Sequence, residues 1–250
     1  MYESAPRRRR LILLRHGEST ANAEDIFGGW LDYALTDSGK HQAAEAGRLL
    51  ATSGLIPDVV HTSRLSRAID TARILIRSSG AQPSIAETWR LNERHYGLLQ
   101  GRSRASVKAE FGQEQFSSWR RSYDALPPGL DRQSPSHPRY DPRYRTLPPL
   151  ELPCSEALAD VRRRVVPYWQ DVLAAHLLDH RTTLVVAHNN SLRALCMHLD
   201  DLTPDEVQSV DIPTGVPLLY LLDTSLRPLE RGGKYVQAGI PAADSRRLPR

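Results

Sequence analysis

The chain has 250 residues, 40% of them hydrophobic and 25% charged, which is typical of a soluble globular protein. This length suits one large α/β domain and is marginal for two. No apolar run approaches the roughly 18 residues that a membrane span needs, so we expect no membrane segment. The formal net charge is +4, but all except three of the 33 basic residues are arginines, which suggests genome composition rather than a nucleic-acid-binding face.

The two ends of the chain carry little patterning. The basic run at residues 7–10 is followed by an apolar stretch too short for a signal peptide, so residues 1–10 are predicted to form a disordered, solvated arm. The chain has two cysteines, Cys154 and Cys196, without metal-type spacing. We therefore expect a cytoplasmic protein without a metal site.

The first half of the chain alternates apolar runs with helical patterns. Residues 11–14 form a continuous apolar run that predicts a buried strand. A helix with N-cap oxygens at residues 36–38 and a stop at Gly54 is predicted next. A short buried strand within 57–63 and a helix within 64–80 follow, and Pro83 restricts the strand predicted within 81–89 to an edge.

The second half starts with a polar helical stretch at 102–119 and a long irregular excursion at 126–153 that contains eight prolines. A helix is predicted from Ser155 to about residue 180, with a kink at Pro167. A buried strand at 184–187, a helix from residue 189 and a last strand within 211–223 complete the pattern. Such alternation predicts a mostly parallel sheet covered by helices.

Two of the predicted strands end in a histidine, His16 in "LLRHG" and His188 in "VVAHN". If the strands are neighbours, both imidazoles point into the crevice at the carboxyl end of the sheet, where α/β proteins bind ligands. Arg15 and Arg67 could join them, and arginine forks match the oxygens of a phosphoryl group. Paired histidines could also bind zinc, but two arginines would repel the cation.

The motifs around these residues resemble a known family. "LLRHGESTAN" is similar to the RHG motif of the histidine phosphatase superfamily. "RLNERHYGLLQG", "WRR", "NSLRAL" and "IPTGVPL" narrow the resemblance to the cofactor-dependent phosphoglycerate mutases, from about residue 10 to about residue 230. The resemblance implies a three-layer α/β/α sandwich with a mainly parallel sheet, in one domain at 11–230 with an irregular lid at about 94–153 and a mobile tail at 231–250.

The resemblance also implies roles for individual residues. His16 is then the nucleophile that becomes phosphohistidine, and Glu93 is the general acid and base for the substrate hydroxyl. Arg15, Arg67 and His188 neutralise the transferring phosphoryl oxygens. The residues expected to bind substrate are Asn22, Gly28, Gly29, Tyr96, Arg104, Arg120, Arg121, Asn189 and Asn190.

Four positions depart from the family pattern. Ala21 stands where tryptophan is usual, Gly28 replaces a threonine, Arg104 replaces a lysine, and Asn189 replaces a glycine beside His188. Asparagine tolerates left-handed backbone better than most residues, so the turn at Asn189 could survive. The catalytic positions are intact, whereas the substrate-recognition residues are altered.

Three functional hypotheses follow. The first is interconversion of 2- and 3-phosphoglycerate through phosphohistidine, primed by 2,3-bisphosphoglycerate, in a homodimer or homotetramer without nucleic-acid or membrane partners. The second is a phosphatase acting on a small phosphorylated acid or sugar, because a more open lid would admit water to the same residues. The third is a non-catalytic phospho-ligand sensor, or a nucleic-acid binder that uses the basic arm.

Overall fold

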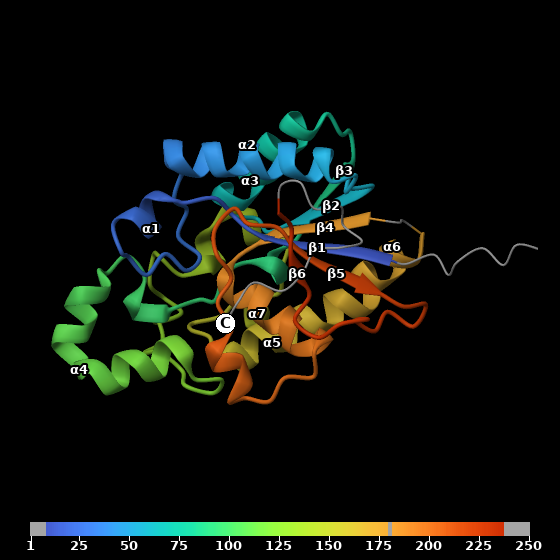
Figure 1. Ribbon diagram of the computed structural model, residues 1–250. Helices are drawn as coiled ribbons and strands as arrows, with labels where there is room; N and C mark the ends of the chain where they lie inside the picture. Colours follow the sequence, from blue (N-terminus) through green and yellow to red (C-terminus); the bar gives the residue numbers. More distant parts are fainter. Residues whose placement is uncertain (1–8, 180–181, 238–250) are drawn as a thin grey trace, which may run out of the picture.

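A computed structural model describes residues 9–179 and 182–237, which form a three-layer α/β/α sandwich (Figure 1). The strands are β1 (Arg9–Arg15), β2 (Val59–Thr62), β3 (Ser84–Glu87), β4 (Thr182–Ala187), β5 (Leu218–Leu222) and β6 (Lys234–Tyr235). They form one sheet in the order β3-β2-β4-β1-β5-β6. The first four in this order pair in parallel, and β5 pairs antiparallel with both β1 and β6, which confirms a mainly parallel sheet.

Strands β1 and β4 are adjacent at the centre of the sheet, with Arg15 paired to Ala187. Along β1, Leu11 and Leu13 belong to one buried cluster while Ile12 and Leu14 belong to another. Alternate side chains of a strand point to opposite faces, so the continuous apolar run fills a core on both sides of the sheet. The pairing also places the two strand-end histidines at the same edge.

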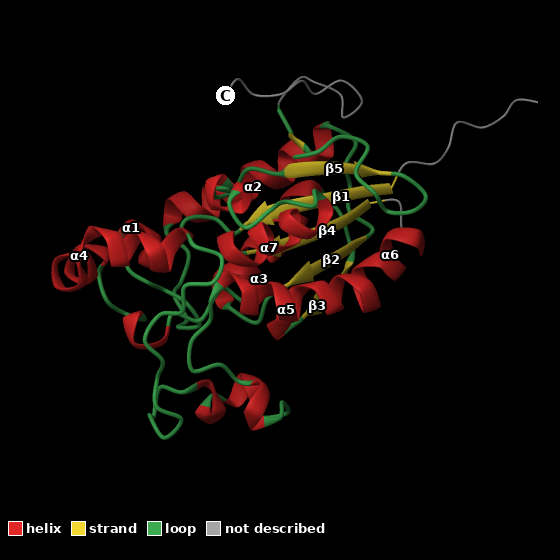
Figure 2. Cartoon of the chain, turned by 90° about the horizontal axis from the view of Figure 1, so that it is seen from below, coloured by secondary structure: helices red, strands yellow, loops and turns green. Residues whose placement is uncertain are grey.

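Helices cover both faces of the sheet. α2 (Asp37–Thr52) and α3 (Ser66–Ser79) lie on one face, and α5 (Leu158–Tyr168), α6 (Ala174–Asp179) and α7 (Asn189–Leu199) lie on the other (Figures 1 and 2). Thr36 caps α2, because its hydroxyl accepts a hydrogen bond from the backbone N–H of Gly39. α3 ends at Gly80, which adopts a left-handed conformation. These helix boundaries agree with the sequence predictions.

The predicted helix from residue 155 differs from the structure at its start and in its middle. It begins at Leu158 rather than near Ser155, because the Asp160 carboxylate accepts a hydrogen bond from the backbone N–H of Ala157 at 2.9 Å. Pro167 lacks a backbone N–H, and a π-helical segment, Trp169–Leu173, separates α5 from α6.

The boundaries predicted for the two termini were also wrong. Arg9 and Arg10 belong to β1, where they pair with Leu222 and Leu221, so the first strand starts two residues earlier than expected. Residues 1–8 lie outside the described residues. At the other end, residues 234–235 form β6, and the backbone N–H of Gly232 donates to Asp200 at 3.0 Å. The tail prediction is therefore corrected for residues 231–237, and residues 238–250 are outside the described part.

The short helix α1 (Thr20–Ala23) and the longer α4 (Arg104–Arg121) lie beyond the carboxyl ends of the parallel strands (Figure 1). α4 is broken at Gly112, which has a φ of 81°. The proline-rich excursion contains 3₁₀ turns and packs against Trp30 and Trp89, where Tyr144 is buried and its hydroxyl accepts a hydrogen bond from Asn92 at 2.7 Å. No helix within residues 9–179 and 182–237 is long and apolar enough to cross a membrane.

Candidate active site

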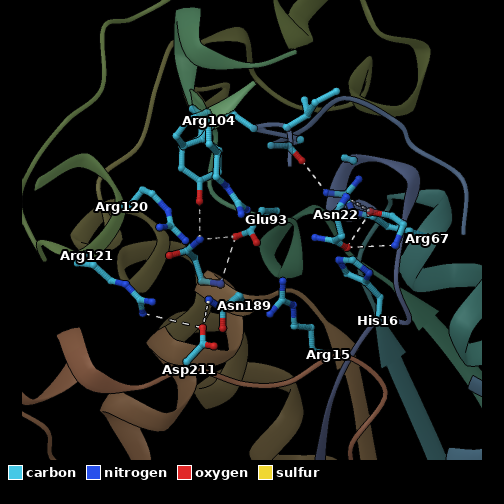
Figure 3. Close-up of a pocket in the computed structure, with 18 residues that line it drawn as sticks. Arg15, His16, Asn22, Arg67, Glu93, Arg104, Arg120, Arg121, Asn189 and Asp211 are labelled. Carbon is cyan, nitrogen blue, oxygen red and sulfur yellow. Dashed lines mark hydrogen bonds and ion pairs between the residues drawn. The ribbon is translucent and has the colours of Figure 1, made fainter. Parts of the chain in front are cut away.

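A polar cavity of about 210 Å³ opens at the carboxyl ends of β1 and β4 (Figure 3). Its lining includes every predicted site residue except His188. The walls also contain four residues to which the sequence analysis gave no role, namely Ser19, Ile26, Phe27 and Asp211. In Figure 3, Glu93 lies between His16 and Arg67 on one side and Arg120 and Arg121 on the other, which we call the inner and outer ends of the cavity.

His16 lies at the inner end, and its Nδ1 donates a hydrogen bond to the carbonyl of Gly17 at 2.7 Å. This bond fixes the tautomer in which Nε2 carries the lone pair. Burial, followed by the charges of Arg67 and Arg15, holds the pKa of His16 well below its usual range. The imidazole is therefore neutral near pH 7, the form that can act as a nucleophile.

The glycine after His16 is required by close packing. A Cβ on Gly17 would lie 2.2 Å from the carbonyl oxygen of Gly39, near the start of α2. The backbone N–H of Gly17 also donates to the Thr71 hydroxyl at 3.0 Å. Any side chain at residue 17 would push the strand end away from α2 and α3.

His188 lies against His16, with 4.9 Å between the ring centroids, but it is fully buried and does not reach the cavity wall. Its Nε2 and the Ser63 hydroxyl are 2.7 Å apart, and its Nδ1 has no hydrogen-bond partner among the described residues. Burial and the charge of Arg67 keep the pKa of His188 well below the usual value. Ser63 was missed because a serine after β2 carries no sequence signal that distinguishes it from a turn residue.

Arg15 and Arg67 are held by backbone carbonyls. Arg15 Nη1 donates to Ile212 at 2.9 Å, and the two terminal nitrogens of Arg67 donate to Leu31 and Gly29 at 2.9 and 2.8 Å. Burial lowers the pKa of Arg67 to about 10, so it remains charged at neutral pH. Within residues 9–179 and 182–237 neither guanidinium forms an ion pair with a carboxylate. Two such cations at one end of a cavity favour an anionic ligand.

The wall beside His16 comes from α1 and the loop after it. The Oδ1 of Asn22 accepts hydrogen bonds from the backbone N–H and the hydroxyl of Ser19, which leaves its amide nitrogen to donate into the cavity. Gly29 has a φ of +51°, and a Cβ there would overlap the Gln100 side chain. Gly28 is different, because a Cβ there would meet only the Cβ of Ala21 at 3.4 Å and the Tyr33 ring.

Glu93 is oriented through one of its two oxygens. Its Oε1 accepts hydrogen bonds from the backbone N–H of Arg94 at 2.7 Å and from the backbone and side-chain nitrogens of Asn190 at 3.2 and 2.9 Å. The side chain of Asn190 also donates to the Tyr96 hydroxyl at 3.0 Å. Within the described residues Oε2 has no partner, so it can exchange a proton with a bound hydroxyl.

The outer end of the cavity carries more arginines. Arg104 Nη1 donates to Asp25 at 2.5 Å, and Arg121 lies 3.9 Å from Asp211. Arg120 forms no ion pair among the described residues, and burial and the charge of Arg104 lower its pKa. The outer end therefore carries three arginines and one carboxylate, Asp211, a charge balance that favours an anionic ligand.

Buried arginines hold the backbone around the site. Arg94 Nη2 donates to the carbonyl of Trp119 at 2.6 Å, and Arg193 donates to Asn190 Oδ1 at 3.0 Å and to the carbonyl of Val207 at 2.8 Å. Arg164 forms a buried ion pair with Glu156 at 2.7 Å. The sequence analysis missed all three, since arginine is usually exposed and nothing local marks a buried one.

Asn189 does not need the left-handed backbone that the sequence analysis considered for it. It is the first residue of α7, and positive φ among the non-glycine residues of the described chain is confined to Asp25, Asp201 and Leu226. Its side chain bridges to the next loop, donating to Asp211 Oδ1 and accepting from the backbone N–H of Ile212, both at 3.1 Å.

Within the described residues, no three His, Cys, Asp or Glu side chains are grouped as a metal site.

Comparisons with known proteins agree with this geometry. The sequence matches the profile of the histidine phosphatase superfamily (branch 1) over residues 11–139 and 130–216. It is 52% identical over 227 residues to the 2,3-bisphosphoglycerate-dependent phosphoglycerate mutase of Thermobifida fusca, covering 90% of this chain and 92% of that protein. It is 49% identical over 235 residues to the protein of the same name from Streptomyces avermitilis, covering 94% and 93%.

The fold also resembles solved structures. One is a mycobacterial glucosyl-3-phosphoglycerate phosphatase, with a TM-score of 0.68 and 24% identity over 88% of this chain and 93% of that chain. Another is Bacillus stearothermophilus YhfR, with a TM-score of 0.66 and 22% identity over 94% and 100% of the two chains. At this level of identity the likeness concerns the fold alone.

Proposed function

The chain belongs to the histidine phosphatase superfamily and, within it, to the 2,3-bisphosphoglycerate-dependent phosphoglycerate mutases, and from this premise we propose a mechanism for its site. The enzyme interconverts 2-phosphoglycerate and 3-phosphoglycerate through a phosphohistidine. The single observation that carries the mechanism is a buried, neutral His16, whose Nδ1–H is bound to Gly17, at the end of a cavity rich in arginine.

In the first step Glu93 removes the proton from the free hydroxyl of the monophosphoglycerate, whose oxygen attacks the phosphorus on primed His16. The bond from phosphorus to Nε2 breaks, and the lone pair returns to His16. In the second step His16 Nε2 attacks the phosphoryl group at the other position of the glycerate, the bond from phosphorus to that oxygen breaks, and the leaving oxygen takes the proton back from Glu93. One phosphoryl group is again on the glycerate and one on His16, and no water is consumed.

Charge on the transferring phosphoryl group is neutralised by the inner end of the cavity. Arg15 and Arg67 are fixed in place by carbonyls, so they need no reorganisation when negative charge develops. The amide nitrogen of Asn22 donates to a phosphoryl oxygen. His188 packs against His16, and its Nδ1, which has no hydrogen-bond partner among the described residues, is the atom that would donate to a phosphoryl oxygen.

The cavity suits 2,3-bisphosphoglycerate as the cofactor, because arginines occupy both ends and no carboxylate pairs with Arg15, Arg67 or Arg120 among the described residues. When bound, this cofactor supplies the phosphoryl group that primes His16. The arginines and Tyr96 at the outer end hold the carboxylate or second phosphate, which fixes the orientation of the glycerate. We infer that the chain requires no metal for this chemistry.

The test is to incubate the protein with 3-phosphoglycerate, with and without catalytic 2,3-bisphosphoglycerate, and to follow 2-phosphoglycerate and free phosphate together. The mutase reaction gives cofactor-stimulated 2-phosphoglycerate with little phosphate. Phosphate released in proportion to substrate consumed would show that the site is a phosphatase instead.

We also propose that the protein forms a homodimer or homotetramer. β3 is an edge strand of the sheet, and it presents Ile85, which is 39% exposed. An open edge with an apolar side chain favours pairing with another chain. Light scattering should give a multiple of the monomer mass for the wild type and for the control Leu229→Lys, and the monomer mass for Ile85→Lys; a monomeric wild type would refute the proposal.

A further inference from the structure

Asp211 is a carboxylate in a cavity that otherwise attracts anions. Among the residues that line the cavity, only Glu93 and Asp211 are acidic, and Glu93 has an assigned part in proton transfer. The Asp211 side chain is 57% exposed and lies at the outer end, 3.9 Å from Arg121 (Figure 3). A carboxylate at this point opposes the ligand charge that the arginines attract.

The position of this carboxylate is fixed by Asn189. The amide nitrogen of Asn189 donates to Asp211 Oδ1, and its amide oxygen accepts from the backbone N–H of the next residue, Ile212, both at 3.1 Å. Arg15 then donates to the carbonyl of Ile212 at 2.9 Å. The loop is therefore tied at consecutive residues to α7 and to the end of β1. Within the described residues Oδ2 of Asp211 accepts no hydrogen bond and remains available to a ligand.

We propose that Asp211, positioned by Asn189, determines specificity by limiting the negative charge that the outer end accepts. It favours a phosphorylated acid with a free hydroxyl group over one with a second phosphate. The inference rests on the proposed function in one respect, that the phosphoryl group binds at the inner end beside His16. The remainder of the ligand must then lie toward Asp211.

The charge of that remainder differs between the two natural ligands. For a monophosphoglycerate it is a hydroxyl and a carboxylate, about one negative charge, whereas for 2,3-bisphosphoglycerate it is a phosphate and a carboxylate, about three. Coulomb repulsion by one carboxylate grows with each added charge and is reduced by water and salt at a half-exposed position. Removal of the Asp211 charge should thus strengthen 2,3-bisphosphoglycerate binding by about three- to tenfold more than 3-phosphoglycerate binding. The hydroxyl of the monophosphate can also donate to Oδ2.

The experiment measures binding of 3-phosphoglycerate and 2,3-bisphosphoglycerate by calorimetry to the full chain carrying His16→Asn, which prevents phosphoryl transfer. The control is Asp70→Asn, which makes the same change in net charge as Asp211→Asn. Asp70 is an exposed aspartate on α3 that pairs with Arg73. Asp211→Asn should raise the affinity ratio of bisphosphate to monophosphate by about three- to tenfold, and less at high salt. Asp70→Asn should leave the ratio unchanged.

Equal effects of Asp211→Asn on the two ligands, or a loss of affinity for both, would overturn the inference. Asn189→Ala tests the positioning part, because a freed loop should move the ratio in the same direction by a smaller factor; a ratio equal to the parent value would refute it. The product assay separates this from the proposed function. If the protein releases only phosphate but Asp211→Asn still raises the affinity ratio, the mutase proposal is refuted and the role of Asp211 in specificity is supported.

Discussion

The buried ion pair between Arg164 and Glu156 can be used to test whether contacts behind the site hold Glu93 in place. Arg164 donates through Nε and Nη2 to the two carboxylate oxygens at 2.7 and 2.9 Å, and both side chains are 5% exposed. It also donates to the carbonyls of Arg90, Asn92 and Glu93 at 2.7, 2.9 and 3.0 Å. The side chain of Arg164 thus anchors the loop at residues 90–93, which carries Glu93, the proposed acid and base.

Arg164→Met keeps an unbranched apolar side chain about as far as Nε and removes all of these donors. Loss of one partner of a buried pair leaves an uncompensated charge and costs about 3–5 kcal/mol. We expect the upper part of this range, because three buried carbonyls lose their donor as well. The turnover number should fall more than the KM rises, since the backbone of Glu93 loses its anchor.

The assay is urea denaturation of the wild type, Arg164→Met and the neighbouring control Arg163→Met. Arg163 pairs with Asp160 at 2.7 Å, but its side chain is 76% exposed, so its loss should cost less than about 1 kcal/mol. The double variant Glu156→Gln with Arg164→Met should recover part of the stability, because it removes the stranded charge. If Arg164→Met lies within 1 kcal/mol of Arg163→Met, the ion pair does not anchor this segment and the reasoning fails.

Three further predictions concern histidines. His16→Ala should abolish phosphoenzyme formation from labelled 2,3-bisphosphoglycerate while the circular dichroism spectrum stays unchanged, and a labelled variant would overturn the assignment of the nucleophile. Ser63→Ala removes the hydrogen bond to His188 Nε2 and should lower the rate about 5- to 100-fold with little change in KM; Ser63→Thr, which keeps the hydroxyl, should recover much of it. Burial lowers the pKa of His95 to about 3, so this residue is neutral when folded and binds a proton when unfolded below pH 6.5. His95 should therefore contribute a decrease of about 1.4 kcal/mol per pH unit to the free energy of unfolding as the pH drops from 6 to 4, in addition to the contributions of His16 and His188, and His95→Gln should remove this part.

The sequence predicts the sheet well because its signals are local. Short apolar runs of about four residues are typical of buried strands, and β1 and β4 fit that pattern. The meeting of His16 and His188 follows from the parallel pairing of these strands, which the alternation of strands and helices made the expected arrangement. His188 lies behind His16 rather than on the cavity wall. This position depends on side-chain packing, which a sequence pattern does not predict.

The parts that sequence reasoning missed are long-range contacts of polar residues. Arg164 is 74 residues from Arg90, whose carbonyl it binds, and Ser63 is 125 residues from His188. An arginine on an amphipathic helix looks exposed until the loop that it holds has folded over it. The start at Arg9 was missed for a related reason, because charged residues at the end of a strand are indistinguishable from a solvated arm.

Three of the four departures from the family pattern, at Ala21, Gly28 and Asn189, have physical consequences that the structure shows. Ala21 and Gly28 form one small-residue patch, because a Cβ on Gly28 would make ordinary contact with the Cβ of Ala21 at 3.4 Å. An added Cβ at residue 28 therefore overlaps nothing beside Ala21, and the backbone at Gly28 does not need positive φ. Asn189 acts differently, since as the first residue of α7 it leaves the backbone ordinary and ties Asp211 to the cavity rim. The asparagine at this position therefore holds a carboxylate at the outer end, and it forms no hydrogen bond with His16 at the inner end.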